Sequence, residues 1–176
     1  MPNWCNNSVL IEGPKEKIKE LWDNSNKDPD KSGLLETMVP MPESESDWYH
    51  WRIDNWGTKW EVNSEGLEYS ESTEDEDRSL IEGSFDSAWS PPKEAFEEFC
   101  AENDDVNIEL HYHECGMCFV GYWDSEGNDE YYEYHEDHIT SENIRELIPE
   151  HIVDEWCLDE QLEDMEEEME EENATS

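Results

Sequence analysis

The sequence predicts an α+β fold in which helices cover one face of a β-sheet. Apolar residues recur at alternate positions in some segments and at three- and four-residue steps in others, so strands and helices alternate along the chain. The 176 residues also include nine Trp, seven Tyr and four Phe, which can bury large areas in a core. Disordered acidic chains are normally poor in such residues. We therefore expect this chain to fold.

The first predicted elements are a strand over residues 7–12 and a helix over residues 15–23. Segment 34–42 carries Pro40 and Pro42, so we expect it to be extended or irregular rather than helical.

An aromatic helix should follow Asp47, a suitable N-cap residue, and end near Gly57. Residues 59–62 predict a short strand. The acidic residues 70–78 predict a connection that lies in solvent.

Residues 79–89 predict another strand, and Ser90 followed by two prolines is typical of a helix start. The helix itself is expected over residues 93–101. Residues 106–123 then form one strand, with a bulge at Gly116, and residues 130–134 are the second arm of a hairpin after the DSEGND turn.

The C-terminal part predicts a short helix over residues 141–147 and, after Pro149, a longer helix towards residue 172. Its apolar residues recur at three- and four-residue steps and are Ile152, Val153, Trp156, Leu158, Leu162, Met165 and Met169. We expect residues 152–162 to pack on the rest of the domain. Met165 and Met169 favour the alternative, a surface that docks a partner.

Without its insertions, the chain has the order strand, helix, strand, strand, helix, strand. This order predicts a ferredoxin-like split βαβ sandwich with an extra β-hairpin and an acidic C-terminal helical extension. We assign residues 1–138 to the ferredoxin-like domain with its aromatic insertion. Residues 139–176 form the extension, whose end should fray because neighbouring glutamates repel.

Five tryptophan-, proline- or cysteine-containing strings occur together in the chain, namely MPNWCNN at residues 1–7, MVPMP at 38–42, WRIDNWGTKW at 51–60, AWSPP at 88–92 and ECGMCFVG at 114–121. Together they resemble an Api-like family of unknown function from bacteriophages and conjugative plasmids. The resemblance covers residues 1–123 and implies a ferredoxin-like domain in a phage or plasmid setting. It implies no catalytic residues. By this comparison, residues 70–78 are an insertion and the tail beyond about residue 140 is an addition.

The net charge of −41, from 51 Asp and Glu against ten Lys and Arg, limits the partners. Direct binding to DNA, RNA or anionic lipid would place like charges together. A basic protein surface is the partner that such a chain attracts, and self-association into a homodimer stays open.

The charge is uneven, since residues 94–176 hold 30 acidic residues against Arg145 alone. Residues 159–172 hold ten acidic residues in fourteen positions. As a helix, this stretch would carry one charge per ~2 Å, close to the ~1.7 Å of duplex DNA. The alternative is that the tail only keeps the protein soluble.

These observations predict a non-enzymatic protein that imitates DNA charge. It would inhibit a host nucleic-acid-binding or defence protein, such as a restriction or CRISPR nuclease. The carboxylates expected to bind the partner are Asp154, Glu155, Asp159, Glu160, Glu163, Asp164, Glu166, Glu167, Glu168, Glu170 and Glu171. The alternative function is a structural or assembly adaptor that docks through its C-terminal helix.

Other motifs carry less weight. His111, His113, Cys115 and Cys118 are residue types that zinc accepts, but they could equally be core and rim residues, and we expect no metal or cofactor. The DSEGND string lacks the residue order of a calcium loop. No nucleotide-binding or hydrolase motif is present.

The aromatic string Trp48, Tyr49, Trp51, Trp56 and Trp60 is expected to pack in the core rather than to form a stacking platform for single strands. Arg52 should pair with a carboxylate or stack on a tryptophan. Five cysteines and no recognisable signal peptide favour reduced thiols in the cytoplasm of a bacterial host, with Cys5 buried.

Overall fold

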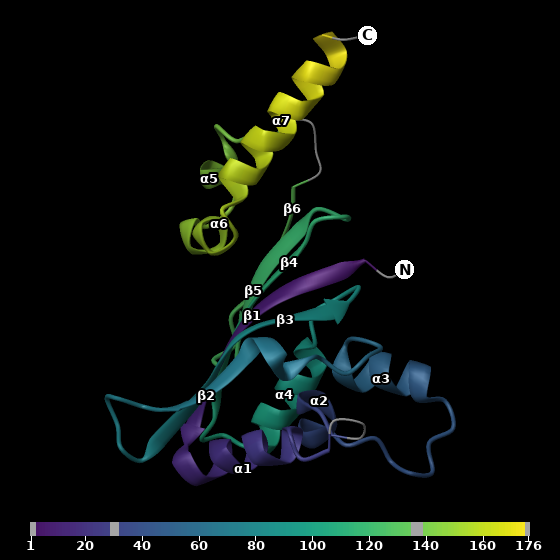
Figure 1. Cartoon of the computed structure of the whole chain (residues 1–176), viewed down its shortest axis with the longest axis vertical. Helices are drawn as coiled ribbons and strands as arrows, with labels where there is room; N and C mark the ends of the chain where they lie inside the picture. Colours follow the sequence, from purple (N-terminus) through teal and green to yellow (C-terminus); the bar gives the residue numbers. More distant parts are fainter. Residues whose placement is uncertain (1–2, 29–31, 135–138, 175–176) are drawn as a thin grey trace.

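The computed structural model describes residues 3–28, 32–134 and 139–174, with side chains up to residue 169 (Figure 1). The strands are β1 (Trp4–Pro14), β2 (Leu67–Glu71), β3 (Arg78–Ala88), β4 (Asn107–Glu114), β5 (Phe119–Asp124) and β6 (Asp129–Glu133). The helices are α1 (Lys15–Ser25), α2 (Leu34–Met38), α3 (Trp48–Trp56), the 3-10 helix η1 (Ser64–Gly66), α4 (Lys93–Glu102), α5 (Ile144–Leu147), α6 (Glu150–Trp156) and α7 (Leu158–Ala174).

The six strands form one sheet in the order β2-β3-β1-β4-β5-β6, and all paired neighbours are antiparallel. The first four strands, with α1 after β1 and α4 after β3, have the connectivity of a ferredoxin-like split βαβ sandwich. Strands β5 and β6 extend this sheet as a meander. The predicted fold class is confirmed.

The main core lies between the sheet and helices α1 to α4, at the lower end of the molecule in Figure 1. Every second residue of β1, including Cys5, Val9 and Ile11, is buried against these helices. Phe96 of α4 and Trp56 of α3 are fully buried there as well. The residues of β1 that alternate with Cys5, Val9 and Ile11 therefore face the opposite side of the sheet.

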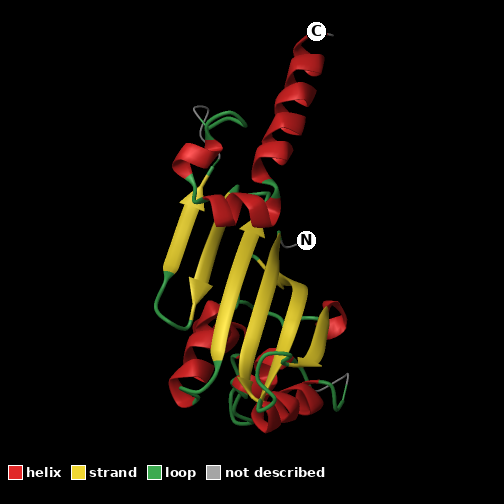
Figure 2. Cartoon of the chain, turned by 90° about the vertical axis from the view of Figure 1, so that its left-hand side faces the viewer, coloured by secondary structure: helices red, strands yellow, loops and turns green. Residues whose placement is uncertain are grey.

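A second core lies on the opposite face, over β5 and β6. Val120 and Tyr134 pack there against apolar residues of the C-terminal helices, namely Ile144, Ile148, Ile152, Val153, Leu158 and Leu162. The prediction that residues 152–162 pack on the rest of the domain is confirmed. Helix α7 begins at this core and extends beyond the ends of the strands (Figure 2).

The aromatic helix has the predicted ends. The side chain of Asp47 accepts a hydrogen bond from the backbone N–H of His50, and Gly57 ends α3 with a φ of 79°. In the part of the chain that the structure describes, no helix combines the length and the apolar character required to span a bilayer.

Segment 34–42 was expected to lack a helix, but Leu34–Met38 forms α2. Pro40 restricts the residue before it, so a helix that ends at Met38 avoids the clash. The carboxylate of Glu61 accepts hydrogen bonds from the backbone N–H groups of Leu35 and Glu36, at 2.9 and 2.8 Å, and stabilises this helix end. The predicted strand over residues 59–62 is wrong, because Glu61 serves this contact and the strand begins at residue 67.

The predicted strand over residues 106–123 is divided into β4 and β5 by a turn at residues 115–118. The Glu114 carboxylate closes this turn by accepting hydrogen bonds from the backbone N–H groups of Gly116 and Met117. Gly116 therefore lies in a hairpin turn and not in a bulge. Ser90 is not the helix cap that we expected, since its hydroxyl donates to the carbonyl oxygen of Gly57.

The single helix expected from residue 150 to residue 172 is interrupted at Cys157. This residue has φ 49° and ψ 47°, a left-handed conformation that ends α6 and turns the chain into α7. Residues 175–176 lie outside the described part, and the fraying of this end stays a prediction.

The left-handed conformation of Cys157 yields a test of the break between α6 and α7. In the left-handed region, a residue with a Cβ atom is destabilised by roughly 1 kcal/mol, whereas glycine is not. We expect Cys157→Gly to be more stable than Cys157→Ala by about 1 kcal/mol in urea unfolding. Equal stabilities of the two variants would contradict a left-handed residue 157.

Candidate acidic interface

One face of the sheet is open over β2, β3 and β1 and over the adjoining part of β4 (Figure 2). The main core occupies the other face, and the C-terminal helices cover only the β4–β6 end. On the open face, Ser8 and Leu10 are half-buried and Glu82 and Glu109 are exposed. The fold therefore leaves this face of the described strands available for a partner.

The strand register brings acidic residues together on this face. Glu68 of β2 lies opposite Glu82 of β3, Glu82 lies opposite Leu10 of β1, and Leu10 lies opposite Glu109 of β4. Adjacent strands are about 4.8 Å apart, so these residues form a row across four strands. We call Glu68, Glu82 and Glu109 the sheet carboxylates. Directly opposed like charges destabilise a sheet, so the pair Glu68 and Glu82 has an energetic cost.

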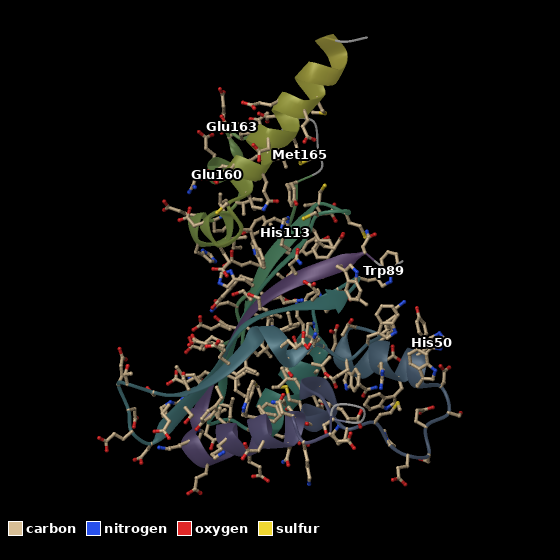
Figure 3. All side chains as sticks on the ribbon, in the orientation of Figure 1. His50, Trp89, His113, Glu160, Glu163 and Met165 are labelled. Carbon is tan, nitrogen blue, oxygen red and sulfur yellow. The ribbon has the colours of Figure 1, made fainter. Side chains whose placement is uncertain are left out.

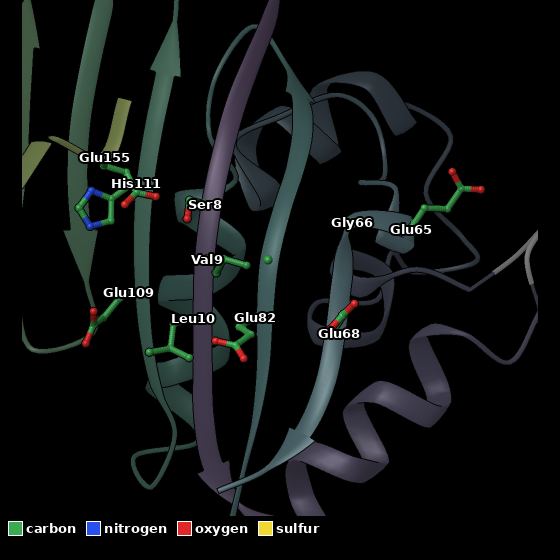
Figure 4. A pocket seen from close by; sticks show the side chains of 11 residues that line it. Ser8, Val9, Leu10, Glu65, Gly66, Glu68, Glu82, Glu109, His111 and Glu155 are labelled. Atoms are coloured by element: carbon green, nitrogen blue, oxygen red, sulfur yellow. The ribbon is translucent and has the colours of Figure 1, made fainter. Parts of the chain in front are cut away.

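The sheet carboxylates line a hollow of about 600 Å³, which Figure 4 shows from close by. Ser8, Leu10 and Gly83 form its floor, and none of its described lining residues is Lys or Arg. Glu155 of α6 and His111 of β4 lie at one end of the hollow (Figure 4). The hollow therefore joins the sheet carboxylates to one of the predicted partner-binding residues, Glu155.

His111 connects the sheet to α6 at this end. Its ring lies 4.8 Å from that of Tyr122 and 5.9 Å from that of His151, measured between centroids. Burial lowers the pKa of His111, and the negative charge of Glu155 opposes this shift. The end of the hollow is thus a packed aromatic contact beside a carboxylate.

Two of the predicted partner-binding residues are paired within the chain. Arg145 donates to Asp154 at 2.7 Å and to Asp159 at 2.9 Å, and its guanidinium lies 4.0 Å from Glu150. The hydrogen bond from Arg145 lowers the pKa of Asp159. Arg145 therefore links α5, α6 and α7, and it reduces the charge that Asp154 and Asp159 offer to a partner.

The remaining predicted residues lie along α7. Glu166 accepts hydrogen bonds from the backbone N–H and the hydroxyl of Ser141, which hold this helix to the segment before α5. Five others are exposed, namely Glu160, Glu163, Asp164, Glu167 and Glu168, and Figure 3 shows Glu160 and Glu163 on the lower part of α7. Glu170 and Glu171 lie outside the residues whose side chains are described.

The candidate zinc residues are not assembled into a site. His113 is buried and shares a hydrogen bond with the hydroxyl of Tyr134, while the Cys115 sulfur lies 3.7 Å from its Nε2. Cys118 lies in the turn with a φ of 53°. In the described ranges, no group of three or more His, Cys, Asp or Glu side chains is arranged to hold a metal ion. His113 is instead a core residue that also packs on Trp156.

The DSEGND segment forms a hairpin turn, as the sequence indicates. The carboxylate of Asp124 accepts hydrogen bonds from Tyr122, from the backbone N–H of Glu126, and from both the backbone and the side chain of Asn128. Burial acts to raise the pKa of Asp124, but these hydrogen bonds outweigh it and lower the pKa.

The aromatic string divides into two groups. Trp56 and Trp51 pack together in the core, with ring centroids 5.9 Å apart, as expected. Trp48, Tyr49 and Trp60 are exposed, so the core prediction is wrong for these three. Arg52 stacks on Trp56 at 4.5 Å, which confirms one of its two predicted roles. Cys5 is buried as expected, and burial raises its pKa to about 12.

Sequence reasoning missed the sheet carboxylates. A local signal for them was present, because acidic residues occupy polar positions where apolar and polar residues alternate along a strand. The register between strands far apart in the sequence was needed to align them, and no local pattern supplies it.

Comparison with known proteins gives a family match over residues 68–175, described as the ferredoxin-like domain in Api92-like protein. The crystal structure of a protein api92 from Yersinia pseudotuberculosis is similar over 60% of this chain, with 17% identity and a TM-score of 0.41. The chain spans 41% of the length of that protein. No curated protein matches this chain.

The family match corrects one expectation about the extent of the resemblance. It includes nearly all of the tail beyond residue 140, which we expected to be an addition, while the insertion at residues 70–78 stays a prediction. The α5–α7 region is therefore part of what this chain shares with the family.

The pair Glu68 and Glu82 yields a stability test. Glu82→Gln removes the repulsion across β2 and β3, so we expect the free energy of unfolding to rise by about 0.5 kcal/mol at low salt. At about 1 M salt the gain should largely disappear, because charges are then screened over about 3 Å. Urea unfolding would measure both values.

Glu43→Gln is the matched control, since it makes the same charge change at an exposed loop position. A similar gain in Glu43→Gln would show that only the net charge matters and not the opposition of two strands.

His113 yields a test at mildly acidic pH. Burial lowers its pKa to about 4, whereas an unfolded histidine takes up a proton near pH 6.5. The contribution of neutral His113 to stability is therefore complete above pH 6.5 and is lost as the pH falls towards 4. Between pH 7.5 and 5.0, we expect the wild type to lose about 2 kcal/mol more than His113→Gln. Parallel pH profiles in urea unfolding would contradict this role.

Proposed function

Because the chain belongs to the family of Api92-like proteins with a ferredoxin-like domain, we propose that it uses this domain as a scaffold for a carboxylate surface. This surface binds a host nucleic-acid-binding or defence protein at its basic, DNA-binding side and inhibits it. The protein acts by binding, without turnover, in the cytoplasm of a bacterial host.

The observation that carries this proposal is the row of exposed sheet carboxylates across four strands, in a hollow without a described Lys or Arg. Negative charges that are gathered in a concave surface raise the local concentration of a cationic partner and speed its association. The chain keeps the opposed pair Glu68 and Glu82 despite its cost, which a bound cationic partner would offset.

Helix α7 supports the same proposal from a second surface. Its exposed residues Glu160, Glu163 and Glu167 lie on a helix that extends beyond the strands, and the stretch 159–172 has a charge density near that of DNA. Glu155 lies at the end of the hollow next to α6, so the acidic surface continues from the sheet towards the C-terminal helices.

To test this proposal, the chain is immobilised and exposed to a bacterial lysate at low and at high salt, and the basic proteins that it retains are identified. We expect the retained protein to be a nucleic-acid-binding protein that duplex DNA displaces. We expect the triple variant Glu68→Gln, Glu82→Gln, Glu109→Gln to weaken its binding at least about 10-fold at low salt.

The matched control carries the same charge change on other surfaces, at Glu16, Glu43 and Glu97, which are all exposed. It should weaken binding by less than about 3-fold. Equal losses in the two triple variants, or a retained protein that DNA does not displace, would overturn the proposal.

A second candidate function is an adaptor that docks through α7. Met165 and Met169 are 50% and 58% exposed and continue the apolar line that Leu158 and Leu162 begin in the second core. In that case, Met165→Gln with Met169→Gln should abolish binding, and the sheet variants should leave it unchanged.

A further inference from the structure

Two exposed tryptophans meet at the start of β1. Trp4 is 48% exposed and Trp60 is 37% exposed, and their ring centroids lie 5.7 Å apart with planes tilted by 43°. Tryptophan side chains are large and usually highly buried, so an exposed pair leaves much apolar surface in water. Trp4 belongs to the same face of β1 as Ser8 and Leu10, and the pair therefore lies at the edge of the open sheet face.

Trp4 forms one wall of a second hollow of about 530 Å³. Asp86, Glu65, Phe85 and Ser84 also line this hollow. Among its described lining residues there is no Lys or Arg. The hollow therefore combines an aromatic wall with carboxylates and lacks a cation of its own.

The carboxylates of this hollow differ in their availability. Glu61 also lines it, but its two oxygens accept hydrogen bonds from the backbone N–H groups of Leu35, Glu36 and Val62. Asp86 accepts one hydrogen bond, through Oδ1, from the side chain of Asn6 at 2.7 Å. Asp86 is exposed and pairs with Asn6, two residues along β1 from Trp4 and on the same face, so its carboxylate can receive a further donor beside Trp4.

A guanidinium group fits this combination. It can stack on an indole ring and at the same time donate hydrogen bonds to a carboxylate, because it is planar with five N–H donors. A lysine ammonium is more strongly hydrated and lacks this planar fork. The chain itself contains such a guanidinium–indole contact, since Arg52 lies over Trp56 at 4.5 Å and over Trp48 at 5.6 Å.

Lys59 lies over the ring of Trp60, 4.0 Å from its centroid. The ring of Trp60 therefore already has a cation, and Lys59 is not among the residues that line the hollow. The available ring is that of Trp4.

We propose that the hollow between Trp4 and Asp86 binds an arginine side chain of the basic partner protein. The arginine stacks on Trp4 and donates to Asp86, and it anchors one end of an interface that continues over the sheet carboxylates. Tryptophan and arginine are the residues that most often dominate the energy of protein interfaces. The identity of the partner as a protein rests on the proposed function, but the affinity of the hollow for arginine does not.

The test uses the whole chain and a short blocked peptide with one arginine, Gly-Arg-Gly, as the probe. The indole N–H signals in NMR distinguish the nine tryptophans once they are assigned. We expect the peptide to shift the signals of Trp4 and Trp60 in a saturable manner. The same peptide with lysine should bind at least about 3-fold more weakly, and the peptide with neutral citrulline should not saturate.

Trp4→Ala should abolish the saturable binding, and Asp86→Asn should weaken it about 5-fold at low salt. Trp48→Ala is the matched control, because Trp48 is 46% exposed but lies on α3. It should leave the affinity unchanged. The proposal is overturned if Trp4 does not respond, if citrulline binds as well as arginine, or if Trp48→Ala reduces the affinity as much as Trp4→Ala.

This experiment separates the two proposals. Suppose that the sheet triple variant still binds the arginine peptide and also retains full binding of the basic protein. That result would contradict the proposed function and not the arginine site. A Trp4 that fails to respond, together with salt-sensitive protein binding that requires the sheet carboxylates, would contradict the arginine site alone.

Discussion

Strand β1 lies at the centre of the sheet and pairs along its whole length with β3 and along most of it with β4. Its residues alternate between two faces, and this alternation divides the molecule. Cys5, Val9 and Ile11 face α1 to α4 and build the main core. Trp4 and Leu10 face the other side, where the acidic surface forms. A shift of the pairing by one residue would exchange these two sets, so the core and the acidic sheet face depend on the same register.

A net charge of −41 opposes any compact state, and the fold limits this repulsion in several ways. Most carboxylates stay in water, where their interactions are screened. Glu61, Glu114 and Asp124 accept backbone hydrogen bonds and so stabilise a helix end and two turns. Arg145 pairs with acidic residues of both α6 and α7. The sheet carboxylates have no Lys or Arg among the described residues that line their hollow, in contrast to Asp154 and Asp159 beside Arg145.

The surfaces that could contact a partner are continuous along one side of the molecule. The hollow beside Trp4 shares Glu65 and Gly66 with the hollow of the sheet carboxylates, and the latter ends at Glu155 of α6. Helix α7 starts just beyond α6 and carries further exposed carboxylates away from the sheet. A basic partner could therefore meet an aromatic anchor, an acidic sheet face and an acidic helix in succession.

The sequence by itself determined the fold class, strands β1 and β3 with the helices α1 and α4 that follow them, and the ends of α3, because apolar periodicity, Asp47 and Gly57 act locally. It also placed the apolar residues of α6 against the domain. It did not determine α2, the turn at residues 115–118 or the break at Cys157, since these depend on contacts with distant residues or on a backbone conformation without a local signal. Only the tertiary structure decided which carboxylates share a surface. Glu68, Glu82 and Glu109 come from three strands, and the pairing that aligns them is a long-range property of the sheet.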